Sequence, residues 1–181
     1  TRKESSLTTI SKKPVNVLGE KIPSPILASE LKFKEDYHLI FVGGPCVNPL
    51  VEQFKEFPSC KDWPLMEGEA MIKYAKNGKN IAMFVAGTTA EDTRMATEFL
   101  KTGKHADIKG RYIKIVNKKP QQANLKESIQ TPESDIGDID FSDYPYPFIK
   151  NGKFQNMLLV VGDNAKAKDT IGAADVAGSL L

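Results

Sequence analysis

Short runs of apolar residues recur along the chain, with glycine or proline closing them. Continuous apolar runs of this length are typical of strands that are buried on both faces, as in a parallel sheet. The pattern therefore predicts strands over residues 15–18, 25–28, 39–42, 81–86, 112–116 and 157–161.

Helical patterns lie between these runs. Residues 67–77 place Met71, Ile72 and Ala75 on one helix face and stop before Gly78, which suits the residue that follows a helix end. The expected helices cover residues 48–57, 67–77, 88–102 and 165–181.

Strand and helix patterns alternate, which predicts an α/β fold. The fold class that we expect is a Rossmann-like layered fold, in which helices flank a mostly parallel sheet. Four prolines and six acidic residues interrupt this rhythm within residues 117–156, and such a stretch is typical of a functional loop or a linker. The expected organisation is a polar arm over 1–13, an α/β core over 14–116, an irregular acidic and proline-rich excursion over 117–156, and a strand plus alanine-rich helix of the same or a neighbouring unit over 157–181.

Composition and charge narrow the classes of function. A net charge of +2 in 181 residues is too small to indicate a nucleic-acid partner. No run approaches the ~18 apolar residues of a membrane span, so none is expected in this segment. The GxSxG, HExxH and GxxxxGK[ST] motifs do not occur, and His38 and His105 show no triad or metal spacing. We therefore expect a protein that is not an enzyme.

Three strand-to-helix corners resemble one another, with the sequences LIFVGGPCVNP, AMFVAGTTAEDTR and LLVVGDNAKAKD. In each of them an apolar strand ends in glycine and a polar turn opens a helix. A parallel sheet would place the corners together along the carboxyl edge of its strands, where open α/β folds bind ligands. Either the glycines only permit tight turns, or the corners form a binding site. The candidate residues of these structural or binding corners are Gly43, Gly44, Asn48, Gly87, Thr88, Thr89, Asp92, Arg94, Gly162, Asp163, Asn164 and Asp169.

The corners differ in the ligands that their side chains favour. Asp163 would repel a phosphate group. Thr88 and Thr89 can bind an anion through their hydroxyl groups and the free N–H groups of the helix that follows. Thr88, with Glu91 three residues later, also predicts a capping box for that helix.

Asp92 and Arg94 fall in the first turns of the same expected helix. A carboxylate there interacts favourably with the helix dipole. The guanidinium group can form a planar ion pair with a neighbouring loop or subunit, or it can bind a ligand.

An acidic run in the excursion consists of Asp135, Asp138, Asp140 and Asp143. Several oxygen ligands on a flexible segment can bind Ca²⁺, so this run is the candidate metal site and Ca²⁺ the one candidate cofactor. The alternative is a solvated loop with apolar anchors. The aromatic–proline segment 144–148 either covers a sheet edge or a neighbouring subunit, or packs on its own domain.

At the corners the sequence resembles a known family. LIFVGGPCVNPLVEQF, then Cys60, then GEAMIKYAKNGKNIAMFVAGTTAEDTRMATEFL resembles a stretch of archaeal S-layer proteins, over about residues 39–100. YPYPFIKNGKFQNMLLVVGDNAKAKDTIGAADVAGSL is similar to a second stretch, in the reverse of the usual order. Both are more distantly similar to cell-wall-binding repeats of bacterial surface proteins.

The resemblance implies a structural protein of the cell surface or cell wall, extracellular and without catalytic residues. Its partners would be other copies of itself or other surface-layer chains, with which it would form a lattice. Because the chain ends at Leu181 directly after a helix, we expect a section of a larger or repeating protein. The alternative is a Rossmann-like module that binds a ligand or a cell-wall polymer.

Cys46 and Cys60 allow one disulfide, but neither a disulfide scaffold nor a four-cysteine metal site. The residues alone leave a disulfide and two free buried cysteines equally open. The resemblance to extracellular proteins favours the disulfide.

Overall fold

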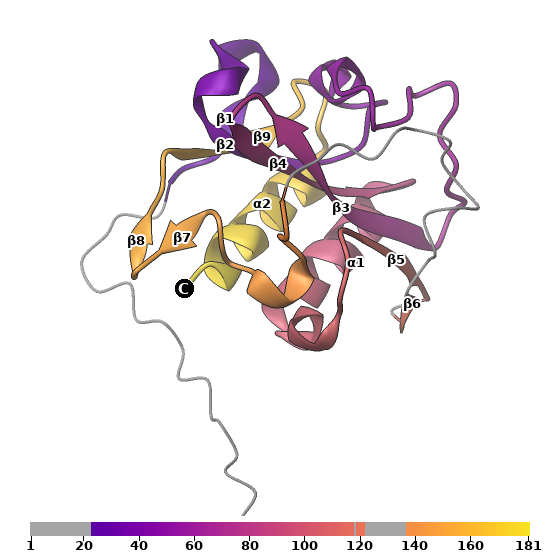
Figure 1. Cartoon of the computed structure of the whole chain (residues 1–181). Coiled ribbons are helices and arrows are strands. Elements are labelled where there is room, and N and C mark those ends of the chain that lie inside the picture. The colour runs from indigo at the N-terminus through magenta and orange to yellow at the C-terminus, as the bar shows by residue number, and fades with distance from the viewer. Residues whose placement is uncertain (1–22, 118, 122–136) are drawn as a thin grey trace, which may run out of the picture.

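The computed structural model describes residues 23–117, 119–121 and 137–181. Its main feature is a seven-stranded sheet with the order β1-β9-β2-β4-β3-β5-β6 (Figure 1). A small separate hairpin joins two further strands. The strands are β1 (Ile26–Leu27), β2 (His38–Val42), β3 (Glu69–Asn77), β4 (Asn80–Gly87), β5 (Tyr112–Val116), β6 (Lys119–Gln121), β7 (Ile149–Lys150), β8 (Lys153–Phe154) and β9 (Met157–Val161).

The sheet has two halves of different type. Strands β1, β9, β2 and β4 pair in parallel, whereas β4, β3, β5 and β6 pair in antiparallel fashion. Strand β9, from the C-terminal part of the chain, lies between β1 and β2. Residues 157–161 therefore form part of the same sheet as the strands from the N-terminal half, rather than part of a neighbouring unit.

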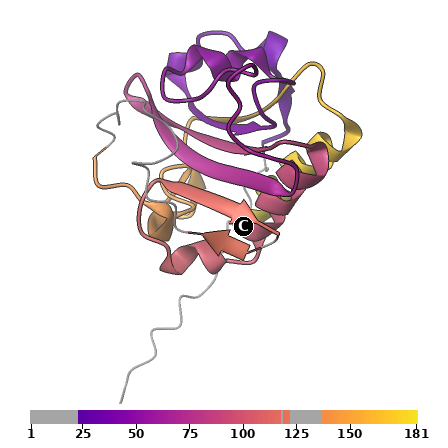
Figure 2. The ribbon, with the colours of Figure 1, turned by 90° about the vertical axis from the view of Figure 1, so that its right-hand side faces the viewer.

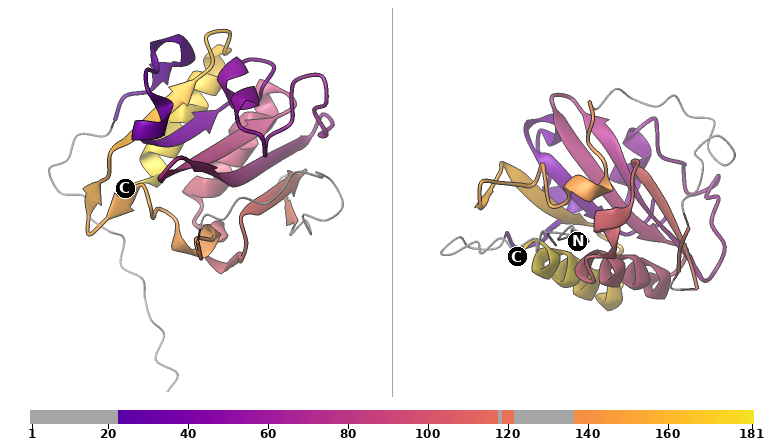
Figure 3. Two further views of the ribbon diagram at one scale, coloured as in Figure 1. Left: turned by 45° about the horizontal axis from the view of Figure 1, so that its top comes forward. Right: turned by 60° about the horizontal axis from the view of Figure 1, so that its bottom comes forward.

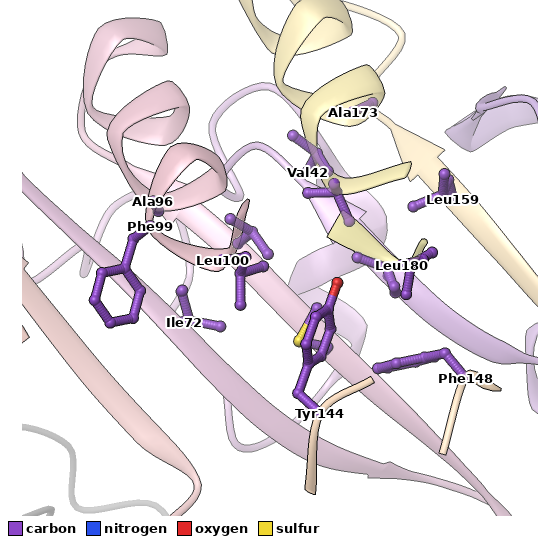
Figure 4. Packing of buried hydrophobic residues seen from close by; sticks show 14 of the residues in the cluster. Val42, Ile72, Ala96, Phe99, Leu100, Tyr144, Phe148, Leu159, Ala173 and Leu180 are labelled. Atoms are coloured by element: carbon purple, nitrogen blue, oxygen red, sulfur yellow. The ribbon is translucent and has the colours of Figure 1, made fainter. Parts of the chain in front are cut away.

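Two α-helices, α1 (Ala90–Lys101) and α2 (Ala167–Ser179), lie side by side on one face of the sheet (Figure 3). Side chains from both helices and from the sheet point into the same apolar layer, including Phe99, Leu100 and Leu159 (Figure 4). A salt bridge of 3.2 Å between Lys101 and Asp175 links the two helices at the surface. Within the described residues no helix has the length and apolar character that crossing a membrane requires.

Irregular chain covers the opposite face (Figure 2). The side chain at its centre is Phe84 of β4, whose ring lies 5.2 Å from that of Phe41, 5.0 Å from Phe54 and 4.4 Å from Phe57, measured between ring centroids. Aromatic side chains thus supply the apolar contact that a second layer of helices would otherwise give. The short 3₁₀ helices of the chain are η1 (Ala28–Glu30), η2 (Lys34–Asp36), η3 (Pro49–Gln53), η4 (Lys104–Asp107) and η5 (Phe141–Asp143).

The expectation of a Rossmann-like fold with helices flanking a mostly parallel sheet is wrong. The sheet is mixed, and the described residues contain two α-helices, both on the same face. The main cause is the segment 67–77, which we expected as a helix and which forms strand β3. Along a strand successive side chains alternate, so Met71 and Ala75 contact the aromatic face while Ile72 contacts the helix face.

A tight turn explains why this segment is a strand. Asn77 pairs with Asn80, so only Gly78 and Lys79 connect β3 to β4. Gly78 has a φ of +62°, a conformation that glycine adopts without steric cost and that short hairpin turns need. The Asn77 side chain donates hydrogen bonds to the carbonyl oxygens of Lys34, at 2.6 Å, and of Tyr37, at 2.9 Å. The turn is therefore fixed against the chain that leads into β2.

Other expected elements shift in type or position. The segment 48–57 contains the 3₁₀ helix η3 rather than an α-helix. The capping box of α1 uses Thr89 and Asp92, one residue later than the expected pair Thr88 and Glu91. The polar arm 1–13 and the expected strand 15–18 lie outside the described residues.

The described part of the excursion packs on the sheet. Tyr144 and Phe148 are buried in the helix-face core, and the Tyr144 hydroxyl hydrogen-bonds the Ser179 hydroxyl at 2.5 Å. Tyr146, between them, remains 41% exposed. The aromatic–proline segment thus packs mainly on its own domain.

The hairpin turn gives a first prediction. Gly78→Ala should lower the free energy of unfolding by about 1–2 kcal/mol, because an alanine at a φ of +62° is strained. Urea denaturation would measure this loss. Lys79→Ala, in the same turn, should change the stability by less than about 0.5 kcal/mol. Equal stability of the two variants would contradict the proposed role of the turn.

Candidate binding site at the strand corners

The three corners meet at one edge of the sheet. Strands β9, β2 and β4 are adjacent and parallel, and Val42 of β2 pairs with both Val161 and Val85. Strands β2 and β9 end at this row of three valines, and β4 continues two residues beyond it to Gly87. Each corner glycine lies within two residues of this row, so the corners are neighbours.

Two of the corner glycines allow close packing. A Cβ atom on Gly162 would lie 2.0 Å from the carbonyl oxygen of Val47, and one on Gly87 would lie 2.4 Å from the Cβ of Asp92. Real Cβ atoms do not approach other atoms so closely. Gly43 has a φ of +102°, which favours glycine for a different reason. These contacts favour the interpretation in which the glycines permit tight turns.

The first corner continues into the 3₁₀ helix η3. Asn48 is fully buried, and its Oδ1 atom accepts a hydrogen bond of 3.2 Å from the backbone N–H of Leu50. The side chain thus caps η3. Gly44 differs from the other corner glycines, because a Cβ atom there would meet nothing closer than 3.6 Å.

Thr89 and Asp92 organise the second corner. The Thr89 hydroxyl accepts from the backbone N–H of Asp92 at 3.2 Å, and the Asp92 carboxylate accepts from the backbone N–H of Thr89 at 3.0 Å. The other oxygen of Asp92 accepts from the backbone N–H of Gly68 at 3.1 Å. Asp92 therefore caps α1 and ties it to the turn before β3.

Two aspartates organise the third corner. Asp163 accepts a hydrogen bond from the backbone N–H of Ser29 at 3.1 Å, which ties the corner to η1. Asp169 is buried, and its Oδ2 atom accepts from the backbone N–H of Lys166 at 3.0 Å, which caps α2. Burial raises the pKa of Asp169, against the opposing effects of this hydrogen bond and of the Lys166 charge. Asn164 is exposed.

Arg94 pairs within its own helix. Its Nε atom lies 3.2 Å from a carboxylate oxygen of Glu98, one turn later, and both side chains are well exposed. Such a pair contributes about 0.3–0.5 kcal/mol to stability. Arg94 also borders a shallow hollow of about 350 Å³, together with Gly68 and Asn117. The expected contact with a neighbouring loop or subunit stays a prediction.

A pocket of about 180 Å³, here called the corner pocket, opens between the first and second corners and the start of α2. It combines a largely apolar wall with hydroxyl groups, an ammonium group and a carboxylate. Its lining residues are Gly44, Pro45, Cys46, Val47, Trp63, Gly87, Thr88, Thr89, Ala90, Thr93, Lys166 and Asp169.

Trp63 forms one wall of the corner pocket and links two corners. Its indole Nε1 donates a hydrogen bond of 3.0 Å to the Thr88 hydroxyl, and its six-membered ring lies against Gly44. Sequence reasoning missed both Trp63 and Lys166. For Trp63 a signal existed, because it is the one tryptophan of the chain and tryptophan is enriched at binding surfaces. One lysine among many carries no such signal.

The expected disulfide between Cys46 and Cys60 is confirmed, with an S–S distance of 2.06 Å. Both cysteines are exposed, and the bond closes a loop whose aromatic side chains cover one face of the sheet. A disulfide is compatible with an oxidising, extracellular compartment.

The acidic run is partly used for local structure. Asp140 accepts from the backbone N–H of Ser142 at 2.8 Å, and Asp143 accepts from the backbone N–H of Asp140 at 3.0 Å. Asp138 is exposed, and Asp135 lies outside the described residues. Among the residues that the structure describes, no three His, Cys, Asp or Glu side chains form a group that could hold a metal ion. Binding of Ca²⁺ stays a prediction.

A comparison of two glycines tests the packing of the corners. Gly162→Ala should lower the free energy of unfolding by about 3 kcal/mol or more, because its methyl group would overlap the Val47 carbonyl. Gly44→Ala, whose methyl group meets only ordinary contacts, should cost less than about 1 kcal/mol. Thermal and urea unfolding of both variants would measure the difference, and equal losses would contradict it.

The disulfide gives a prediction of its own. Replacement of Cys46 and Cys60 by serine should lower the free energy of unfolding by about 3 kcal/mol, since the bond closes a loop of 14 residues. Urea denaturation with and without reductant would measure the loss. Reductant should destabilise the wild-type protein and leave the double variant unchanged. Full labelling of both thiols in the native, unreduced protein would contradict the bond.

Comparisons with protein-family models, with curated proteins and with solved structures found no match for this chain.

Proposed function

We propose that this chain is a structural module of a cell surface that acts by self-association into a surface layer. The proposal starts from the resemblance of its paired VGGP and VAG…AEDTR motifs to archaeal S-layer proteins. It assigns the chain to the outside of the cell, with other copies or other surface-layer chains as partners.

The disulfide is the observation that carries the proposal. An exposed disulfide between Cys46 and Cys60 is what an extracellular protein would use and what a reducing cytoplasm would disfavour. It also restrains the irregular segment that covers the aromatic face of the sheet.

The residues of the resembling motifs have structural roles in this chain. Gly87 permits the close approach of β4 and α1, and Asp92 caps α1 while holding the turn before β3. Gly162 permits the contact between the third corner and Val47. These roles are structural, and they support a scaffold function for the motifs.

Self-association requires surface that other copies can cover. Among the described residues, large apolar side chains are exposed at several separate places, and the most exposed of them is Phe33, at 76%. Phe33 also has a φ of +52°, a strained conformation for a residue with a side chain. An extended array needs at least two different contact surfaces on each copy. A single surface that pairs with itself gives only a dimer. The exposed side chains are Leu27, Phe33, Met66, Tyr146, Ile171 and Leu181.

A second candidate function is a module that binds a ligand or a cell-wall polymer. The observation that favours it is the corner pocket, which lies where parallel strands end and which contains both a buried carboxylate and an indole ring. The two candidate functions are compatible, since a lattice unit can also bind a surface ligand.

Phe33→Gly tests self-association. Because burial of a phenylalanine contributes about 1.5–3 kcal/mol, the variant should raise the concentration of half-association at least about tenfold. Its free energy of unfolding should stay equal or rise, since glycine relieves the strain at φ +52°. Concentration-dependent light scattering and electron microscopy would measure assembly, with Lys32→Ser, at the adjacent exposed residue, as the control. A wild-type chain that stays monomeric at every concentration would refute the proposal.

A further inference from the structure

We propose that the corner pocket binds one neutral sugar ring, stacked on Trp63 and hydrogen-bonded to Asp169. The proposal deepens the second candidate function above, and it holds whether or not the chain self-associates. It rests on the size of the pocket, on its aromatic wall and on a carboxylate oxygen of Asp169 that accepts no hydrogen bond from the described residues.

The volume of the pocket limits the ligand. At about 180 Å³ the corner pocket is smaller than the ~300–1,000 Å³ of sites for drug-sized ligands. A dinucleotide therefore does not fit, whereas a single six-membered ring does. The pocket is open at one side, so the ring can belong to a longer chain whose other units remain in solvent.

Trp63 supplies a rigid aromatic wall. The hydrogen bond from its indole N–H to Thr88 and its contact with Gly44 hold the ring at two ends, and Phe57 packs against it at 5.8 Å between ring centroids. The C–H groups on the flat side of a sugar ring are apolar and slightly positive, and they are attracted to the negative face of an aromatic ring. An immobile indole lets a sugar stack at little cost in side-chain entropy.

Asp169 supplies the acceptor. Its side chain lines the pocket and is only 2% exposed, and its Oδ2 atom already accepts from the backbone N–H of Lys166. No residue in the described part of the chain donates a hydrogen bond to Oδ1. The lone pairs of Oδ1 are therefore free to accept a hydrogen bond from a sugar hydroxyl group in the pocket.

The opposite side of the pocket supplies donors. The Thr88 hydroxyl oxygen is occupied by the Trp63 N–H, which leaves its own hydrogen to donate to a ligand. The backbone N–H of Ala90 lies in the first turn of α1, where helices have no internal acceptor for it. Each sugar hydroxyl group can both donate and accept a hydrogen bond, so a sugar ring can use the donors on one side of the pocket and the acceptor on the other.

Charge decides between a neutral ring and an ion. An anion in the pocket would meet electrostatic repulsion from the Asp169 carboxylate. A cation would meet the Lys166 ammonium group and the positive ends of α1 and α2. A neutral hydroxylated ring encounters neither penalty.

The test uses the fluorescence of Trp63, which reports on the pocket alone because the chain has no other tryptophan. Glucose, galactose, mannose and N-acetylglucosamine would be titrated into the dilute full chain, with inorganic phosphate as the anionic probe. At least one sugar should shift or quench the emission in a saturable manner, and phosphate should not. A saturable response to phosphate alone, or no response to any sugar, would overturn the proposal.

Two variants check the location of the site. Asp169→Asn replaces the acceptor that faces the pocket and should weaken sugar binding about tenfold or more. Asp175→Asn removes a carboxylate from the same helix outside the pocket and is the matched control for charge. Gly44→Ala adds a methyl group next to the indole without a close contact in the fold, so it should weaken binding even if Asp169→Asn is unstable.

Unchanged sugar affinity in both Asp169→Asn and Gly44→Ala would place the site elsewhere and overturn the proposal. Light scattering on the same samples keeps the two proposals apart. A wild-type chain that assembles but shows no response to sugar would refute only the sugar site. A wild-type chain that binds sugar but stays monomeric would refute only the surface lattice.

Discussion

The parallel pairing of β2 with both β9 and β4 is the constraint on which the rest of the structure depends. It places Val42 level with Val161 and Val85, so β2 and β9 end in one row and β4 ends two residues further on. Everything that follows these strands must then turn within a narrow space. Gly162 and Gly87 satisfy that requirement, because a side chain on Gly162 would overlap Val47 of the first corner and one on Gly87 would overlap the start of α1. The corners and the pocket between them are thus consequences of strand register.

The apolar side chains on the two faces of the sheet are buried by different kinds of structure. On one face α1 and α2 supply regular apolar side chains, whereas on the other an irregular segment packs its phenylalanines around Phe84. Fixing an irregular segment costs backbone entropy as forming a helix does, but without the internal hydrogen bonds that a helix gains. The Cys46–Cys60 disulfide offsets part of that cost, since it restricts the same segment in the unfolded state.

The strands of the parallel half, and β5 in the antiparallel half, could be predicted from the sequence, whereas β3 could not. Strands with short apolar runs between glycines, such as β2 and β9, are distinctive. Strand β3 is buried on both faces, so its apolar positions fit a helix as well as a strand, and periodicity cannot separate the two. The Asn77–Gly78 turn was the local evidence for a hairpin. Expecting β3 as a helix led directly to the wrong fold class.

The corner pocket shows why a site is harder to predict than the strands that frame it. A glycine at the end of a strand can be recognised in the sequence. The sequence does not tell whether that glycine permits close packing of two segments or lines an open pocket. Gly162 packs directly against Val47, whereas Gly44 lines the corner pocket, which Trp63 fills only in part. The indole arrives from a segment that the disulfide holds over the sheet, 19 residues after Gly44 in the chain. Long-range covalent and packing constraints, rather than any local motif, therefore bring the aromatic ring to the carboxylate of Asp169.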